Sequence, residues 1–308
     1  MTPVKGPLEI GRMMDALDAW EGALPSNWAV RPKGTVFPYF CSVMKGDGTR
    51  VKVRFLMLEG WQTFHDFVRT RQDRFFGFYS TPMELPHYEL VAFPDGVVNV
   101  FRHDPGYVPR QLRPEEEGLV AKILWESYGV LMRIESEPRL ALRYADSNAM
   151  FSRHETAPGE WADAPLPIAA PAVYVERISF PKDDIARAKD LPFATDEAWE
   201  VDFRFLPSLV TQEPRPRCAY ALVAVDAKTG ERIVSDRVSV SRDGGLKALW
   251  ESMPSRLLKH ILARGRFPGE IRLVSGRVFR MVRPLCQQIP FKLSMHDSLP
   301  RLEAAFRR

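Results

Sequence analysis

The chain has 308 residues, of which 45% are hydrophobic and 27% are charged. This length and composition are typical of a soluble globular protein with two domains of ordinary size. Residues 1–24 contain Glu9, Asp15, Asp18 and Glu21, so they lack the uninterrupted apolar run of a signal peptide. No stretch reaches the roughly 18 consecutive apolar residues of a membrane span, so we expect no membrane association.

The cysteines and histidines give no metal or disulfide pattern. Three widely spaced cysteines without a Cys-x-x-Cys pair favour buried thiols in a reducing cytosol, so we expect a cytoplasmic protein. The histidines do not fall at the spacing of metal ligands, and we therefore expect neither a structural zinc site nor a bound cofactor. The residues concerned are Cys41, Cys218, Cys286, His65, His87, His103, His154, His260 and His296.

Charge is distributed unevenly along the chain. Residues 201–308 contain 20 lysines and arginines and 10 aspartates and glutamates, whereas the other 200 residues contain 23 and 29. The basic half is suited to an anionic partner. It is equally suited to docking on the acidic half of the same chain.

The N-terminal part alternates helical and strand patterns. The apolar positions of residues 8–20 share one helical face, and Lys45-Gly46-Asp47-Gly48-Thr49 predicts the turn of a β-hairpin. The predicted elements in order are a helix over 8–20, strands over 39–44 and 50–58, a helix over 61–71, and strands over 75–79, 88–93 and 97–102.

A long helix is predicted from Pro114 to about Ser136. Proline suits the first turn of a helix, and Glu115, Glu116 and Glu117 complement the positive end of the helix dipole. The three glutamates are consecutive, so their side chains spread around the helix. They therefore do not predict a metal cluster.

Residues 139–171 lose this periodicity and collect prolines. We expect a Pro-rich linker or an exposed excursion there, with a strand at 141–144 as its one regular element. This divides the chain into an N-terminal α+β module over residues 1–140, a linker or excursion over 141–171, and a C-terminal α/β module over 172–308. Strands over 173–179 and 199–206, with a short helix over 183–189 between them, open the second module.

The order of elements after residue 219 is the feature that narrows the fold class. We predict strand, strand, helix, strand, helix, strand and helix, which makes a mixed α+β or α/β module. The ranges are 220–226, 232–240, 246–264, 270–274, 278–288, 291–295 and 299–308.

Two groups of short motifs resemble a family of uncharacterised bacterial two-module proteins with domains of unknown function. The first is Pro105-Gly106-Tyr107-Val108-Pro109 before the acidic helix. The second is Asp226-x-x-Thr229-Gly230, followed by Gly265-Arg266-Phe267-Pro268 and the Leu299-Pro300-x-Leu302 ending. The resemblance implies a bacterial, cytoplasmic protein and no settled activity.

The C-terminal order of elements also resembles the core of ribonuclease H-like integrases and transposases. In those enzymes, carboxylates on two adjacent strands and on a later helix hold two magnesium ions. Asp226 matches the first carboxylate position, but Ser275 stands where the second belongs, and arginines follow it. The resemblance therefore implies a degenerate, non-catalytic member, with a magnesium-dependent nuclease or phosphoryl-transfer enzyme using Asp226 as the alternative.

Asp226 also has a purely structural interpretation, which we prefer. Asp-Ala-Lys-Thr-Gly between two apolar strands is the sequence of a hairpin connection. In such a connection the aspartate caps its own turn and Gly230 takes a positive φ.

The C-terminal arginines are the best functional candidate. Arginine's planar fork suits phosphate oxygens, and such contacts give salt-sensitive, sequence-independent binding. We therefore expect a non-catalytic binding protein whose basic surface contacts nucleic acid or an acidic protein partner. A structural subunit of a larger assembly is a further alternative. The candidate residues are Arg256, Lys259, Arg264, Arg266, Arg277, Arg280 and Arg283.

Overall fold

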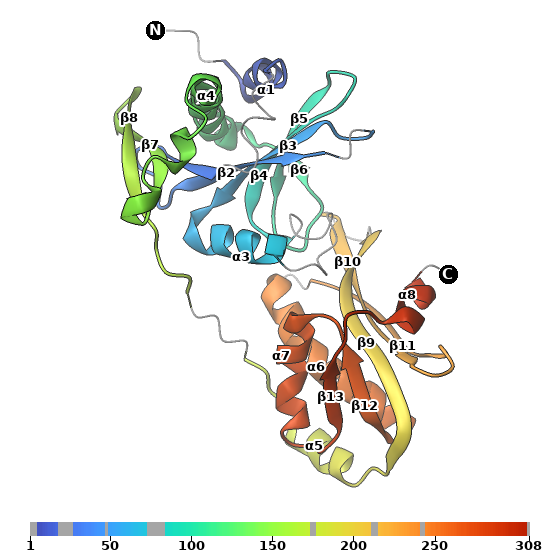
Figure 1. The fold of residues 1–308 in the computed structure, drawn as a ribbon. Coiled ribbons are helices and arrows are strands. Elements are labelled where there is room, and N and C mark those ends of the chain that lie inside the picture. The colour runs from blue at the N-terminus through green and yellow to red at the C-terminus, as the bar shows by residue number, and fades with distance from the viewer. Residues whose placement is uncertain are drawn as a thin grey trace. The chain divides into compact units, whose positions relative to one another are not determined.

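The computed structural model describes residues 5–17, 27–46, 49–72, 84–172, 177–210, 215–240 and 244–306. The chain forms two compact units (Figure 1). Unit 1 comprises Met1–Pro105 and Pro109–Val173, and unit 2 comprises Gly106–Val108 and Tyr174–Arg308. Both units combine helices with a β-sheet, which confirms the predicted α+β class.

Unit 1 is built on a sheet that has eight strands in the described part of the chain, in the order β6-β5-β4-β3-β2-β1-β7-β8. Strands β1 to β6 form an antiparallel meander, and β7 pairs in parallel with β1. Its elements are α1 (Pro7–Asp15), β1 (Asn27–Arg31), β2 (Tyr39–Lys45), β3 (Val53–Glu59), α3 (Gly60–Gln72), β4 (His87–Ala92), β5 (Val98–His103), β6 (Arg110–Gln111), α4 (Pro114–Ser136), the 3₁₀ turns η2 (Leu140–Leu142) and η3 (Ala145–Ser147), β7 (Ala149–Ala157) and β8 (Glu160–Pro167).

Helices cover both faces of this sheet, with α1 and α4 on one face and α3 on the other (Figure 1). Successive side chains of a strand point to opposite faces. In β3, Phe55 and Met57 accordingly join the core under α1 and α4, while Leu56 and Leu58 join Phe64 of α3. The strands of this meander are therefore buried on both sides, which explains their nearly continuous apolar sequence.

The predicted hairpin, the helix after it and the long acidic helix are confirmed as β2–β3, α3 and α4. At the start of α4, the Glu116 carboxylate accepts a hydrogen bond of 2.8 Å from the backbone N–H of Arg113, which closes the cap. The strand predicted over 75–79 lies outside the described residues. For the strand predicted over 173–179, residues 173–176 also lie outside them, and residues 177–179 are not in a strand.

The linker or excursion expected over residues 141–171 is wrong. Most of this segment forms η2, η3 and the antiparallel pair β7–β8, which extends the sheet of unit 1 beyond β1. The strand expected at 141–144 is also wrong, because the turn η2 occupies its first half. Pro165 and Pro167 lie in β8, the last strand of the sheet, where a missing N–H breaks no inner ladder.

Unit 2 contains a sheet with the order β11-β10-β9-β12-β13. The expected succession of strands and helices after residue 219 is confirmed, and the longer strand β9 precedes it and lies at the centre of the sheet. Its elements are α5 (Lys182–Lys189), β9 (Phe193–Val210), β10 (Arg217–Asp226), β11 (Arg232–Ser239), α6 (Gly245–Arg264), β12 (Phe267–Leu273), α7 (Gly276–Cys286), β13 (Lys292–Met295) and α8 (Pro300–Phe306).

Alternation along β10 again assigns the two faces of this sheet. Ala221, Val223 and Val225 pack with Leu302 of α8. Tyr220 points to the opposite face, where its ring lies 6.5 Å from that of Trp250 in α6. Helices α6 and α7 cover that second face, and α8 covers the first (Figure 1).

Residues 106–108 of the Pro-Gly-Tyr-Val-Pro motif pair with residues 216–218 and form a short edge segment of unit 2. The Cys218 N–H donates to the Gly106 carbonyl at 2.9 Å, and the Val108 N–H donates to the Pro216 carbonyl at 3.1 Å. Gly106 has a φ of +81°, and a Cβ there would lie 2.4 Å from Cγ1 of Val240. Glycine is therefore required at this position by both the backbone angle and the close approach.

No helix in the described ranges is both long and apolar enough to cross a membrane.

Candidate functional site

Three of the seven predicted basic residues are held by acidic neighbours. Arg256 contacts Asp236 at 3.1 Å. Arg264 and Arg266 both contact Glu197, at 2.9 and 2.7 Å. Burial raises the pKa of Glu197, but hydrogen bonds from Trp199 and Arg266 and the charges of both arginines outweigh it and lower that pKa. These three arginines therefore serve mainly to neutralise carboxylates within unit 2.

Arg277 is engaged by an aromatic ring. Its guanidinium carbon lies 3.7 Å from the centroid of the Trp250 ring, which belongs to the neighbouring helix α6 and is buried. A guanidinium over the face of tryptophan is attracted by the negative charge density of the ring. This contact joins α7 to α6, and it gives Arg277 a structural role.

The remaining three predicted residues, Lys259, Arg280 and Arg283, are exposed and form no ion pair within the described part of the chain. Lys259 lies on α6, and Arg280 and Arg283 lie on α7, which packs against α6. Residues 276–286 include three arginines and no acidic residue. We call Lys259, Arg280 and Arg283 the exposed basic residues.

Asp226 caps its own turn, as the structural interpretation predicted. One carboxylate oxygen accepts from the backbone N–H groups of Lys228 and Thr229 at 2.9 and 2.6 Å, and from the Thr229 hydroxyl at 2.9 Å. Burial raises the pKa of Asp226, and these hydrogen bonds outweigh it and lower that pKa. Gly230 has a φ of +75°. The geometry is that of a closed hairpin connection, which confirms this interpretation.

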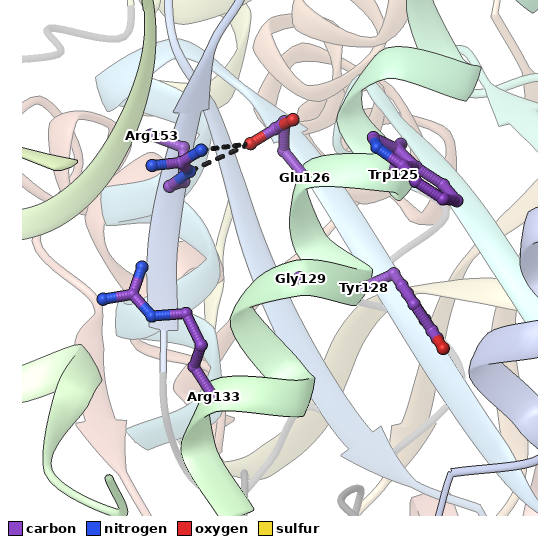
Figure 2. Close-up of a pocket in the computed structure, with 6 residues that line it drawn as sticks. All are labelled: Trp125, Glu126, Tyr128, Gly129, Arg133 and Arg153. Atoms are coloured by element: carbon purple, nitrogen blue, oxygen red, sulfur yellow. Dashed lines mark hydrogen bonds and ion pairs between the residues drawn. The ribbon is translucent and has the colours of Figure 1, made fainter. Parts of the chain in front are cut away.

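A pocket of about 340 Å³ lies over the outer face of α4. In Figure 2, Trp125 and Tyr128 lie on one side of the helix, Arg133 and Arg153 lie on the other, and Gly129 separates them. Glu126 also lines it, and it accepts a hydrogen bond of 2.9 Å from Nε of Arg153.

The charges around this pocket are compensated by one another. Arg133 and Arg153 both contact the Asp163 carboxylate, at 2.8 and 2.9 Å. Burial raises the pKa of Glu126, although Arg153 opposes the rise. One wall of the pocket is therefore aromatic, and the charges on the other wall cancel one another. The pocket accordingly favours neither a cationic nor an anionic ligand.

Sequence reasoning missed a cluster of titratable residues in unit 1. Within the described ranges, His87, Glu89 and His103 are the one group of three metal-ligating side chains whose ligand atoms lie within 4.8 Å of one another. Nε2 of His103 lies 2.7 Å from one carboxylate oxygen of Glu89, and Nε of Arg54 lies 2.5 Å from the other. The two histidine rings stack with their centroids 4.2 Å apart.

Burial and the neighbouring charged groups together set the ionisation of this cluster. It lowers the pKa of His87 to about 3, with a further contribution from His103. For Glu89, burial raises the pKa, but the hydrogen bond and charge of His103 and the charge of Arg54 outweigh it and lower the pKa to about 2. At neutral pH the cluster therefore combines a neutral His87 with an ionised Glu89.

The signal for this cluster is present in the sequence, across a hairpin and not along one segment. His87-x-Glu89 places two side chains on one face of a strand, and His103 directly follows the strand predicted over 97–102. Histidine spacing along the chain does not show this, because the two histidines become neighbours only through the pairing of β4 with β5.

Comparisons with known proteins give a match to a family model over the C-terminal part of the chain, but no activity. Residues 184–308 match the model of a family described as a domain of unknown function, DUF6930. This agrees with the expected domain of unknown function in the C-terminal part. No curated protein matches the chain.

One solved structure that matches is the cryo-EM structure of the simian T-cell lymphotropic virus intasome in complex with PP2A regulatory subunit B56 gamma. The two chains are 16% identical, and the TM-score is 0.25. The match covers 37% of this chain and 39% of the viral-complex chain, so it spans well under half of either.

Proposed function

We propose that the protein is a non-catalytic binding protein whose unit 2 contacts the phosphate backbone of nucleic acid through the exposed basic residues. The observation that carries the proposal is helix α7. It presents Arg280 and Arg283 to solvent without an acidic residue anywhere in the helix. Residues three apart on a helix are neighbours on its surface, so the two guanidinium groups can engage one phosphate-rich segment.

The surroundings of α7 support this assignment. Arg256, Arg264 and Arg266 are bound to acidic residues of the same unit, so among the charged candidates outside the Arg277–Trp250 contact the uncompensated ones are Lys259, Arg280 and Arg283. Phosphate contacts made by such residues position a nucleic acid without reading its sequence. We therefore propose binding that is sequence-independent and strongly weakened by salt.

A ribonuclease H-like arrangement of unit 2 remains part of the proposal. Its support is the sheet order β11-β10-β9-β12-β13, with β12 parallel to β9 and β13 parallel to β12. Asp226 gives no support to the nuclease alternative, because three hydrogen bonds from its own turn hold one of its carboxylate oxygens and give the residue a structural role. We also propose a reducing cytosol as the location, supported by three free cysteines.

The test is fluorescence anisotropy with labelled duplex DNA, single-stranded DNA and RNA. The salt concentration is varied between about 50 and 200 mM, a range over which binding through phosphate contacts weakens strongly. The Arg280→Glu/Arg283→Glu double variant is expected to bind at least about tenfold more weakly, and to lower the slope of log K against log salt by about two. The control is Arg12→Glu, an exposed helical arginine of unit 1 without an ion pair among the described residues.

Three outcomes decide the proposal. Steep salt dependence that the double variant loses and the control keeps supports it. Absence of binding at the lowest salt contradicts it, and charge-dependent binding of polyglutamate in its place indicates an acidic protein partner. Equal binding by the double variant and the wild type contradicts the assignment of the exposed basic residues.

A further inference from the structure

We propose that His87, Glu89 and His103 of unit 1 form a binding site for one divalent transition-metal ion, of which Zn²⁺ is the model. The three residues supply two imidazole nitrogens and one carboxylate oxygen, a ligand set that suits zinc and its first-row neighbours. This site belongs to unit 1, so it is independent of the function proposed for unit 2.

The strand register brings the three ligands to one face of the sheet. His87 and Glu89 are two residues apart on β4, so both side chains point to the same side. His103 of β5 is the direct cross-strand partner of His87. Leu58 and Leu56 of β3 pair with His87 and Glu89 and belong to the core under α3, which identifies this side as the α3 face. Three strand positions thus bring the ligands together without any loop, and the two stacked histidine rings must turn out of their parallel arrangement for both lone pairs to meet one ion.

His87 is already held in the tautomer that a metal needs. Its Nδ1 lies 2.8 Å from the carbonyl oxygen of Leu85. A carbonyl can only accept, so Nδ1 carries the proton and Nε2 presents a lone pair. A histidine ligand characteristically donates its other ring N–H to a backbone carbonyl or carboxylate in this way.

The lone pair of His87 has no partner among the described residues. The His87 side chain is fully buried, and its Nε2 makes no hydrogen bond within the described part of the chain. Leaving a buried acceptor unpaired is unfavourable, because the atom gives up its hydrogen bonds to water without gaining another. A cation bound between His87, Glu89 and His103 pairs this atom directly.

Glu89 and His103 already place two possible ligand atoms side by side. Nε2 of His103 lies 2.7 Å from a carboxylate oxygen of Glu89. An ion bound at this point replaces the direct contact between the two atoms, and a neutral histidine that binds an ion through Nε2 carries its proton on Nδ1. The remaining carboxylate oxygen stays with Arg54, at 2.5 Å, and this contact fixes the orientation of Glu89.

Arg54 also limits which ions the site accepts. Its charge offsets that of Glu89, so the site attracts hard cations poorly, and two of its three ligands are nitrogen atoms. Magnesium and calcium require several oxygen ligands. The site is therefore expected to bind Zn²⁺ and Co²⁺ and to ignore Mg²⁺ and Ca²⁺.

The experiment uses the full chain without a histidine tag, stripped with EDTA and titrated with Zn²⁺ by calorimetry and with Co²⁺ by visible absorption. The expected result is about one ion per chain, a Co²⁺ ligand-field band, and a Tm that rises with Zn²⁺ concentration because the ion binds only the folded state. Mg²⁺ at the same concentrations is expected to leave Tm unchanged.

The variants are His87→Gln, Glu89→Gln and the control His154→Gln, a half-buried strand histidine of unit 1 outside the cluster. His87→Gln and Glu89→Gln are each expected to weaken binding at least about tenfold, whereas the control binds as the wild type does. Circular dichroism establishes that each variant is folded.

Two results overturn the proposal, and neither depends on a variant's stability alone. The first is a wild-type protein that binds no Zn²⁺ and shows no Tm shift, in which case Arg54, Glu89 and His103 form a closed ion-pair network. The second is binding that survives in a folded His87→Gln protein, which places the ion elsewhere.

Discussion

The guanidinium of Arg277 lies 3.7 Å above the ring of Trp250, and this contact makes one predicted phosphate-binding residue part of the packing between α7 and α6. Trp250 in turn meets Phe203 of β9 edge to face, with centroids 4.7 Å apart. The guanidinium of Arg277 thus covers the outer end of a pair of aromatic rings, Trp250 and Phe203, that extends into the core of unit 2.

Arg277→Glu is expected to destabilise unit 2 by about 1–2 kcal/mol, because it replaces an attractive charge by one that the negative face of the ring repels. Urea unfolding measures the change. Arg277→Lys is expected to keep part of the stability, and Arg280→Glu on the exposed face should stay within about 0.5 kcal/mol of the wild type. Equal effects at positions 277 and 280 would contradict the structural role of Arg277.

Gly106→Ala tests the short edge formed by residues 106–108. A methyl group meets Val240 at 2.4 Å and also forces a positive φ on alanine, so we expect a loss of about 2–4 kcal/mol. The matched control is Gly96→Ala, which has a φ of +79° and no atom within 4 Å of the added carbon. Its smaller loss isolates the backbone cost, and in a Val240→Ala background the additional loss caused by Gly106→Ala should fall to about that of Gly96→Ala.

Asp226→Ala should lower the free energy of unfolding by about 1–2 kcal/mol, since it leaves the N–H groups of Lys228 and Thr229 without their acceptor. Nucleic-acid binding measured by anisotropy should not change. Magnesium-dependent cleavage of the label by the wild type, abolished by Asp226→Asn, would be the result that refutes a structural Asp226.

Protonation of Glu270 is expected to lower the stability of unit 2 at acid pH. Burial raises the pKa of this carboxyl, but hydrogen bonds from Lys292, Ser294 and Arg272 outweigh it and lower the pKa to about 2. Its folded-state pKa lies below the ordinary value, so its contribution is complete above about pH 4.5 and is lost as pH falls toward about 2.

The measurement for Glu270 is urea unfolding of the wild type and of Glu270→Gln between pH 7 and pH 2. The variant should be less stable at neutral pH, and the difference should shrink as the pH falls below 4.5, roughly the ordinary pKa of glutamate. A difference that stays constant over this range would show that Glu270 acts through packing and not through its charge.

Gly129→Ala is expected to stabilise unit 1 by about 0.5–1 kcal/mol, because glycine inside a helix is less favourable than alanine. A carbon added there meets no atom within 4 Å, and the residue is exposed in the middle of α4. Thermal unfolding measures the gain. A loss of stability would show that the pocket between Trp125 and Arg133 has a structural requirement for glycine.

Local signals in the sequence determined much of the fold. The turn after Asp226, the cap around Pro114 and Glu116, and the hairpin of β2 and β3 each depend on residues close together in the chain. The order of strands and helices after residue 219 follows from such signals, which is why it could be predicted.

Contacts between residues far apart in the sequence are not contained in these local signals, and only the tertiary structure decided them. The partner of β7 is β1, more than a hundred residues away along the chain, so a proline-rich sequence could not reveal that the β7–β8 pair joins the sheet. Pairing across the fold likewise assigned Arg264 and Arg266 to Glu197 and left Arg280 and Arg283 exposed. His87 and His103 face each other because the register of β4 and β5 makes them cross-strand partners, and register is set by packing across the whole sheet.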